Sequence, residues 1–113
     1  VLGKLPAGRV KIIGGLSRFY CNIVAGSATI DIGWQGYNDT SGTAVAADPD
    51  GMVDGLDVDA VGYQTMEGNT AATKLLGGNH KFNSNDGVVI EITSVAALAN
   101  DDDVDGVITY IVS

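Results

Sequence analysis

Cysteine, proline and long apolar runs are scarce in this 113-residue chain, and each scarcity excludes a class of protein. The single cysteine, Cys21, has no second cysteine to pair with, so the chain is not a disulfide-stabilised scaffold. Its two prolines and 16 glycines follow no repeating period, which excludes a collagen-like chain. The apolar runs are a few residues long, whereas a membrane-spanning helix needs about 18 or more. No membrane partner is therefore expected.

Histidine is equally scarce, and this limits the chemistry that the chain can perform. A serine or cysteine triad needs a histidine, so any such triad must contain His80, the only one. His80 falls in an expected loop, and Cys21 falls in an expected strand, where a buried thiol is the ordinary case. One cysteine and one histidine supply only two of the ligands that zinc usually needs. We therefore expect no catalytic residues, no enzyme activity, no cofactor and no metal site.

The net charge of −8 is unevenly distributed along the chain. Residues 1–30 contain four basic residues and no acid, whereas residues 31–113 contain all 14 acids. The four basic residues are Lys4, Arg9, Lys11 and Arg18. Because nucleic-acid binding requires a basic face, an acidic chain is a poor candidate for it. The basic segment either docks on an acidic protein partner or pairs with the chain's own acids.

Short strands dominate the secondary structure that the sequence predicts. The alternation of polar and apolar residues, or β-branched and aromatic content, predicts strands over residues 9–12, 18–24, 28–34, 43–46, 81–82, 88–93 and 106–112. Residues 25–27 predict a tight hairpin between two of these strands. The last strand is apolar on both faces, which predicts a central, covered strand, with a neighbouring subunit as one candidate cover.

Turn and helix signals separate these strands. Turns are expected over residues 38–42, 48–51 and 85–87, and residues 52–60 form either an extended edge or one helical turn. Helical segments are expected over residues 70–76 and 94–100. The pattern predicts an all-β, mainly antiparallel fold, as a jelly-roll-like sandwich or barrel with one or two short helical turns. Residues 1–113 form one β-rich domain, with residues 1–8 as an extended N-terminal arm.

Two acidic clusters and two aromatic residues are the other candidate sites. The run from Asp101 to Gly106 matches the opening of a calcium-binding loop, but position twelve is Val112 where a glutamate is needed. A solvated acidic loop is the favoured interpretation, with an incidental Ca²⁺ as the alternative. The acids over residues 48–59 are interpreted as solvated too. Trp34 and Tyr37 are either core or subunit-contact residues, or a sugar-binding platform.

Three groups of motifs carry a resemblance to a known family. They are LPAGRV at residues 5–10 with ATIDIGW at residues 28–34, AADPDG at residues 46–51 with GLDVDA at residues 55–60, and DGVITY at residues 105–110. Together they resemble small virion structural proteins of tailed bacteriophages, over most of the chain. The resemblance implies a β-rich head decoration protein, commonly trimeric, that binds the major capsid protein on the outside of the virion and stabilises it.

The residues that we expect at such an interface are Lys4, Arg9, Lys11, Arg18, Val107, Tyr110 and Ile111. The basic ones are expected to meet an acidic patch on the capsid or on the next subunit. The apolar ones are expected to be buried by symmetric assembly. The alternatives are a tail, collar or baseplate component, or a small carbohydrate-binding module.

Overall fold

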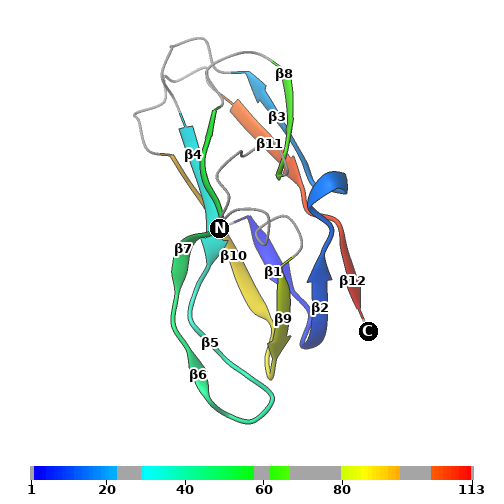
Figure 1. Cartoon of the computed structure of the whole chain (residues 1–113), viewed down its shortest axis with the longest axis vertical. Helices are drawn as coiled ribbons and strands as arrows, with labels where there is room; N and C mark the ends of the chain where they lie inside the picture. Colours follow the sequence, from blue (N-terminus) through cyan, green and yellow to red (C-terminus); the bar gives the residue numbers. More distant parts are fainter. Residues whose placement is uncertain (1, 23–28, 58–61, 67–79, 95–102, 113) are drawn as a thin grey trace.

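The structure is a computed structural model that describes residues 2–22, 29–57, 62–66, 80–94 and 103–112 (Figure 1). Its largest sheet has four strands, in the order β1 (Gly3–Leu5), β10 (Val88–Ser94), β4 (Thr29–Trp34) and β7 (Asp48–Asp57). One three-stranded sheet has the order β11 (Asp103–Val107), β3 (Arg18–Asn22) and β8 (Gly62–Thr65). The other has the order β12 (Tyr110–Val112), β2 (Gly8–Ile12) and β9 (Lys81–Ser84). A hairpin of β5 (Tyr37–Asn38) and β6 (Ala44–Val45) completes the described strands.

All of these strand pairs are antiparallel, which confirms the predicted all-β class. The four-stranded sheet faces the two three-stranded sheets in a sandwich-like arrangement (Figure 1). The core between them draws on strands of each of these sheets and comprises Leu5, Val10, Ile12, Phe19, Ile30, Ile32, Trp34, Met52, Val53, Leu56, Met66, Phe82, Val88 and Ile90. The predicted alternation is confirmed in β2, where Val10 and Ile12 are buried while Arg9 and Lys11 are exposed.

The pairing of β4 with β7 is interrupted twice by extra residues on β7. Between the pairs Ile30↔Leu56 and Ile32↔Val53, β7 has one residue more than β4, which is a β-bulge. Gly55 takes the positive φ of 77° that the bulge requires, and its N–H donates to Asp31 Oδ1 at 2.8 Å. The second irregularity lies between Ile32 and Trp34 and is larger, because four residues of β7 oppose one of β4.

One turn prediction falls on this second irregularity and is wrong. Residues 48–51, expected as a turn, lie within β7 instead. Pro49 has no N–H to donate to a neighbouring strand, so it is tolerated at an edge strand and at a bulge, and β7 provides both. The alternative of an extended edge for residues 52–60 is confirmed as far as Asp57, and the rest lies outside the described residues.

The predicted hairpin between residues 18–24 and 28–34 is wrong, because these segments belong to different sheets. β3 pairs with β11 and β8, whereas β4 pairs with β10 and β7. The connecting residues 25–27 lie outside the described residues. Residues 38–42 do form a turn, with Gly42 at a φ of 83° and Asp39 Oδ1 accepting the N–H groups of Ser41 and Thr43.

The helical predictions are mostly outside the described residues. Residues 70–76 and 95–100 are among those not described, and Ser94 ends β10. A 3₁₀ turn, η1 (Gly14–Leu16), occurs where the sequence predicts no helix. In the expected N-terminal arm, residues 3–5 form β1 and pair with β10. The described residues include no helix long and apolar enough to cross a membrane.

Candidate functional site

The last two strands form one long edge, which we call the C-terminal edge (residues 103–112). β11 pairs with β3 from Asp103↔Asn22 to Val107↔Arg18, and β12 pairs with β2 from Tyr110↔Ile12 to Val112↔Val10. Since β2 and β3 are joined by η1, the two ladders follow one another along the same side of the molecule (Figure 1).

Hydrogen bonds around Ser17 hold the two ladders together. Ser17 is fully buried, and its Oγ donates to Ile13 O at 2.9 Å and accepts the Thr109 N–H at 3.0 Å. The Thr109 hydroxyl in turn donates to Leu16 O at 2.8 Å. The break between β11 and β12 is therefore fixed to η1, and the C-terminal edge is held as a unit.

The structure corrects the prediction of a central strand over residues 106–112. β11 and β12 are each the outermost strand of their sheet among the described residues. Val104 of β11 packs against the core, but three other apolar side chains face solvent: Val107 is 65% exposed, Ile111 53% and Val112 57%. A long apolar edge of this kind is a template for pairing with another chain. The apolar content that the sequence shows at these positions is thus not explained by burial within the described part of the chain.

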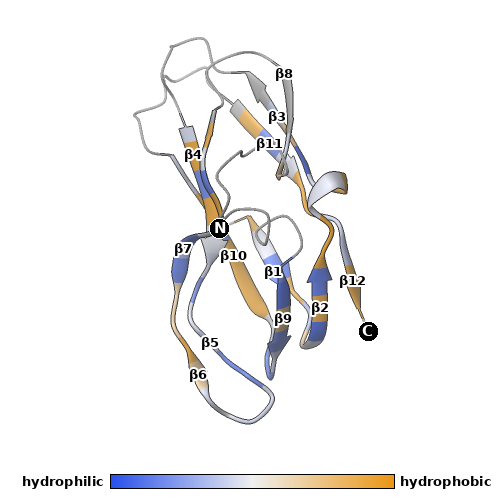
Figure 2. Ribbon diagram, in the orientation of Figure 1, coloured by the Kyte–Doolittle hydropathy of each residue, from blue (hydrophilic) through white to orange (hydrophobic). Residues whose placement is uncertain are grey.

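The predicted basic interface residues all lie beside this edge. Arg9 and Lys11 line a groove with Ile111, Lys4 lines a second depression with Tyr110, and Arg18 lines a third with Val107. Figure 2 shows hydrophilic residues on β9 and on β2, and β2 lies between β9 and the hydrophobic end of β12. The structure therefore brings the two halves of the predicted site, basic and apolar, together.

Sequence reasoning missed two members of this surface. Lys81 lies directly opposite Lys11 across the β2–β9 pair. It was missed because it lies outside the basic first 30 residues, and only the strand pairing brings it there. Leu16, 58% exposed, lines the same depression as Arg18 and Val107. An apolar residue next to two glycines in an exposed turn was a signal that the sequence offered.

The residues considered for other chemistry belong to a core of aromatic rings. Trp34 is buried, stacks on His80 at 4.4 Å between ring centroids, and donates its Nε1–H to Ala46 O at 3.1 Å. Phe82 packs edge-on against Trp34 and against Tyr37. Trp34 is thus a core residue, and its burial argues against a sugar platform built on it. Cys21 lies in β3, and His80 precedes β9 in another sheet.

This aromatic environment makes the stability of the protein sensitive to pH. Burial lowers the pKa of the His80 imidazole from its ordinary value, and the Asp48 carboxylate opposes this to a smaller extent. As pH falls through about 6.5, the unfolded chain therefore takes up the proton before the folded one, and the free energy of unfolding decreases. We expect a lower midpoint of thermal unfolding at about pH 5.5 than at about pH 7.5.

The control for this prediction is His80→Phe, which keeps an aromatic ring against Trp34 and removes the titrating group. Because His80 is the only histidine, the fall in the unfolding midpoint over this pH range should be smaller in the variant. An equal fall in both proteins contradicts the assignment to His80.

Neither acidic cluster forms a gathered site in the described residues. Asp103 and Asp105 lie in β11, and Asp101 and Asp102 lie outside the described residues. An extended, paired strand differs from the loop that wraps around Ca²⁺. Asp48, Asp50 and Asp54 are spread along β7. No group of three or more potential metal ligands occurs among the histidine, cysteine, aspartate and glutamate residues that the structure describes.

Comparisons of the chain with protein families, with curated proteins and with solved structures find no match. Function is therefore inferred from the C-terminal edge, from the basic residues beside it and from the resemblance carried by the sequence motifs.

Proposed function

We propose that the chain is a head decoration protein of a tailed bacteriophage, which binds the major capsid protein on the outside of the virion as a homo-oligomer, with a trimer favoured. The observation that carries the proposal is the C-terminal edge, with its exposed apolar side chains and adjacent cations. An edge of this length would invite aggregation if it had no cover. A stable protein that displays it is suited to assembly with other chains.

The binding energy is expected to come mainly from apolar area. Burying one valine or isoleucine side chain stabilises a complex by about 1.5–3 kcal/mol. Val107 and Ile111 lie on β11 and β12 and both project into solvent, so one partner surface that covers the edge buries both. The cations beside them add steering toward an acidic partner, which raises the rate of association more than the affinity.

The double variant Val107→Lys/Ile111→Lys should lose capsid binding by about a hundredfold or more, since it places two charges where apolar area is buried. Both side chains are exposed, so the fold should be retained. The measurement is co-sedimentation with purified tailless capsids, together with the mass of the isolated protein by light scattering.

A matched control is Thr43→Lys/Ala44→Lys, which adds the same charge at two exposed positions of the β5–β6 hairpin, away from the C-terminal edge (Figure 1). This control should bind capsids as the unmodified chain does. A stable monomer that also fails to bind capsids overturns the proposal. Binding to tails but not to tailless capsids assigns the protein to a tail, collar or baseplate instead.

A further inference from the structure

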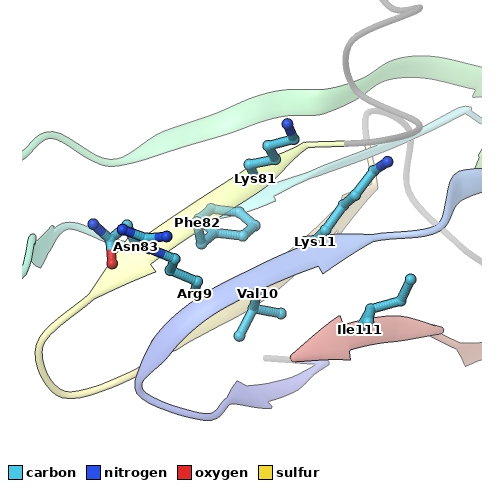
Figure 3. A pocket seen from close by; sticks show the side chains of 7 residues that line it. All are labelled: Arg9, Val10, Lys11, Lys81, Phe82, Asn83 and Ile111. Carbon is cyan, nitrogen blue, oxygen red and sulfur yellow. The ribbon is translucent and has the colours of Figure 1, made fainter. Parts of the chain in front are cut away.

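Two lysines lie directly opposite one another on the outer face of the sheet β12-β2-β9. Lys11 on β2 pairs with Lys81 on β9, and both side chains are exposed. Figure 3 shows them extending to the same side of the sheet, while Val10 points to the opposite side. Like charges in directly opposed positions destabilise a sheet. The repulsion between the two lysines therefore lowers the stability of the folded state, and an anion bound between them would offset this repulsion.

Arg9 adds a third cation to the same face. It lies two residues before Lys11, so its side chain projects to the same side of β2. With Lys11, Lys81, Asn83 and Ile111 it lines a groove of about 490 Å³, which we call the basic groove. None of the described residues that line it is acidic. Three of the six basic residues of an acidic chain are therefore gathered in a groove whose described lining contains no acid.

The basic groove also has an apolar component. Val10 and Phe82 lie beneath it and are buried, and Ile111 forms its side on β12. Asn83 is fixed by a hydrogen bond from its Nδ2 to Thr40 Oγ1 at 2.9 Å. An occupant that satisfies both components carries negative charges and apolar groups together. A nucleic acid fits poorly, because the net charge of −8 repels a long polyanion.

The spacing of the cations matches an extended polypeptide. Alternate residues of a strand lie about 7 Å apart, and neighbouring strands lie about 5 Å apart. Arg9 and Lys11 repeat at the first spacing along β2, and Lys11 and Lys81 at the second across the pair. Carboxylates at alternate positions of an extended segment have the same repeat. Because side chains of an extended segment alternate between its two faces, the carboxylates at alternate positions all face the groove, and their methylene groups lie over Ile111, which pairs with Lys11.

We propose that the basic groove binds an extended, acidic segment of a partner protein, with its carboxylates at Lys11, Lys81 and Arg9 and the methylene groups of these acidic side chains against Ile111. The source of the segment rests on the proposed function, under which it belongs to the capsid protein. The preference of the groove for acidic residues at alternate positions does not depend on that assignment.

The experiment is a fluorescence anisotropy titration with a short labelled peptide that alternates glutamate and valine. The unmodified chain should bind it, with weaker binding at high ionic strength. A peptide that alternates lysine and valine, and a single-stranded oligonucleotide, should bind at least about tenfold more weakly. Failure to bind the acidic peptide, or equal binding of either of the other probes, overturns the proposal.

Substitution of Lys81 separates binding from stability. Lys81→Glu should weaken binding of the acidic peptide by about tenfold. It should also raise the midpoint of thermal unfolding, because a Lys–Glu pair replaces two opposed lysines. Lys81→Arg keeps the charge and should retain peptide binding. Unchanged peptide affinity in Lys81→Glu overturns the proposal, as does a loss of affinity accompanied by a lower unfolding midpoint, which marks damage to the fold.

Capsid co-sedimentation of the same variants distinguishes the two proposals. If the acidic peptide binds and capsids do not, the proposed function fails and the groove assignment stands. If capsids bind the unmodified chain and Lys81→Glu equally well, and the peptide binds neither of these two proteins, the groove assignment fails and the proposed function stands.

Discussion

Replacement of Gly33 by alanine is expected to lower the free energy of unfolding by about 3 kcal/mol. Gly33 is the residue of β4 that lies opposite four residues of β7, and it is buried. A Cβ at this position would overlap the backbone of Asp48 and Pro49. The obstacle is backbone in a segment flanked by the pairs Trp34↔Asp48 and Ile32↔Val53, so it cannot rotate away as a side chain does.

The bulge over Gly33 also positions Trp34, which increases the expected damage. A Cβ on Gly51, within the same bulge, would overlap the Trp34 ring, so this part of β7 lies directly on the indole. Displacement of β7 by an alanine at residue 33 would therefore disturb the aromatic core around Trp34 and His80 as well.

Chemical denaturation with matched glycine variants measures this effect. The control is Gly3→Ala in β1, where nothing lies within 4 Å of the added Cβ. This substitution should change the free energy of unfolding by less than about 0.5 kcal/mol. Similar losses in both variants contradict the view that the close approach of β7 makes residue 33 critical.

Local patterns predicted strands well, but they did not predict which strands pair. The alternation predicted over residues 28–34 is confirmed from Thr29 onward, because Ile30, Ile32 and Trp34 face one core, and Ala28 lies outside the described residues. The hairpin between residues 18–24 and 28–34 failed for a different reason. Turn-forming residues are compatible with a tight turn and with a crossover to another sheet, and the choice depends on partners such as β10 and β11, which are distant in sequence.

The candidate site was predicted in composition but not in arrangement. An apolar segment over residues 106–112 is typical both of a buried central strand and of an exposed edge that a partner covers, and hydropathy alone does not separate them. The basic residues of the first 30 positions were evident from charge. Their proximity to Ile111 and to Lys81 depends on the pairing of β2 with β12 and β9, which the sequence does not encode locally.

Phe19 supports the C-terminal edge, and its substitution is the second one expected to have a large effect on the free energy of unfolding. Phe19 is fully buried in β3 and pairs with Gly106 of β11. A Cβ on Gly106 would lie 2.6 Å from two carbons of the Phe19 ring, so the ring covers this glycine. Phe19→Ala should therefore lower the free energy of unfolding by about 3–5 kcal/mol, since it leaves a cavity beneath the edge. Leu16→Ala, at an exposed position, should change it by less than about 0.5 kcal/mol.

A double-mutant cycle tests whether Phe19 acts through Gly106. Gly106→Ala alone should lower the free energy of unfolding by about 1–3 kcal/mol, because the added methyl group meets the Phe19 ring. In a Phe19→Leu background the same substitution should cost less, since a smaller side chain leaves room for the methyl group. The difference is the coupling energy between the two positions. Additive losses would mean that the ring does not limit residue 106, and that β11 is held at the edge by its backbone ladder with β3 alone.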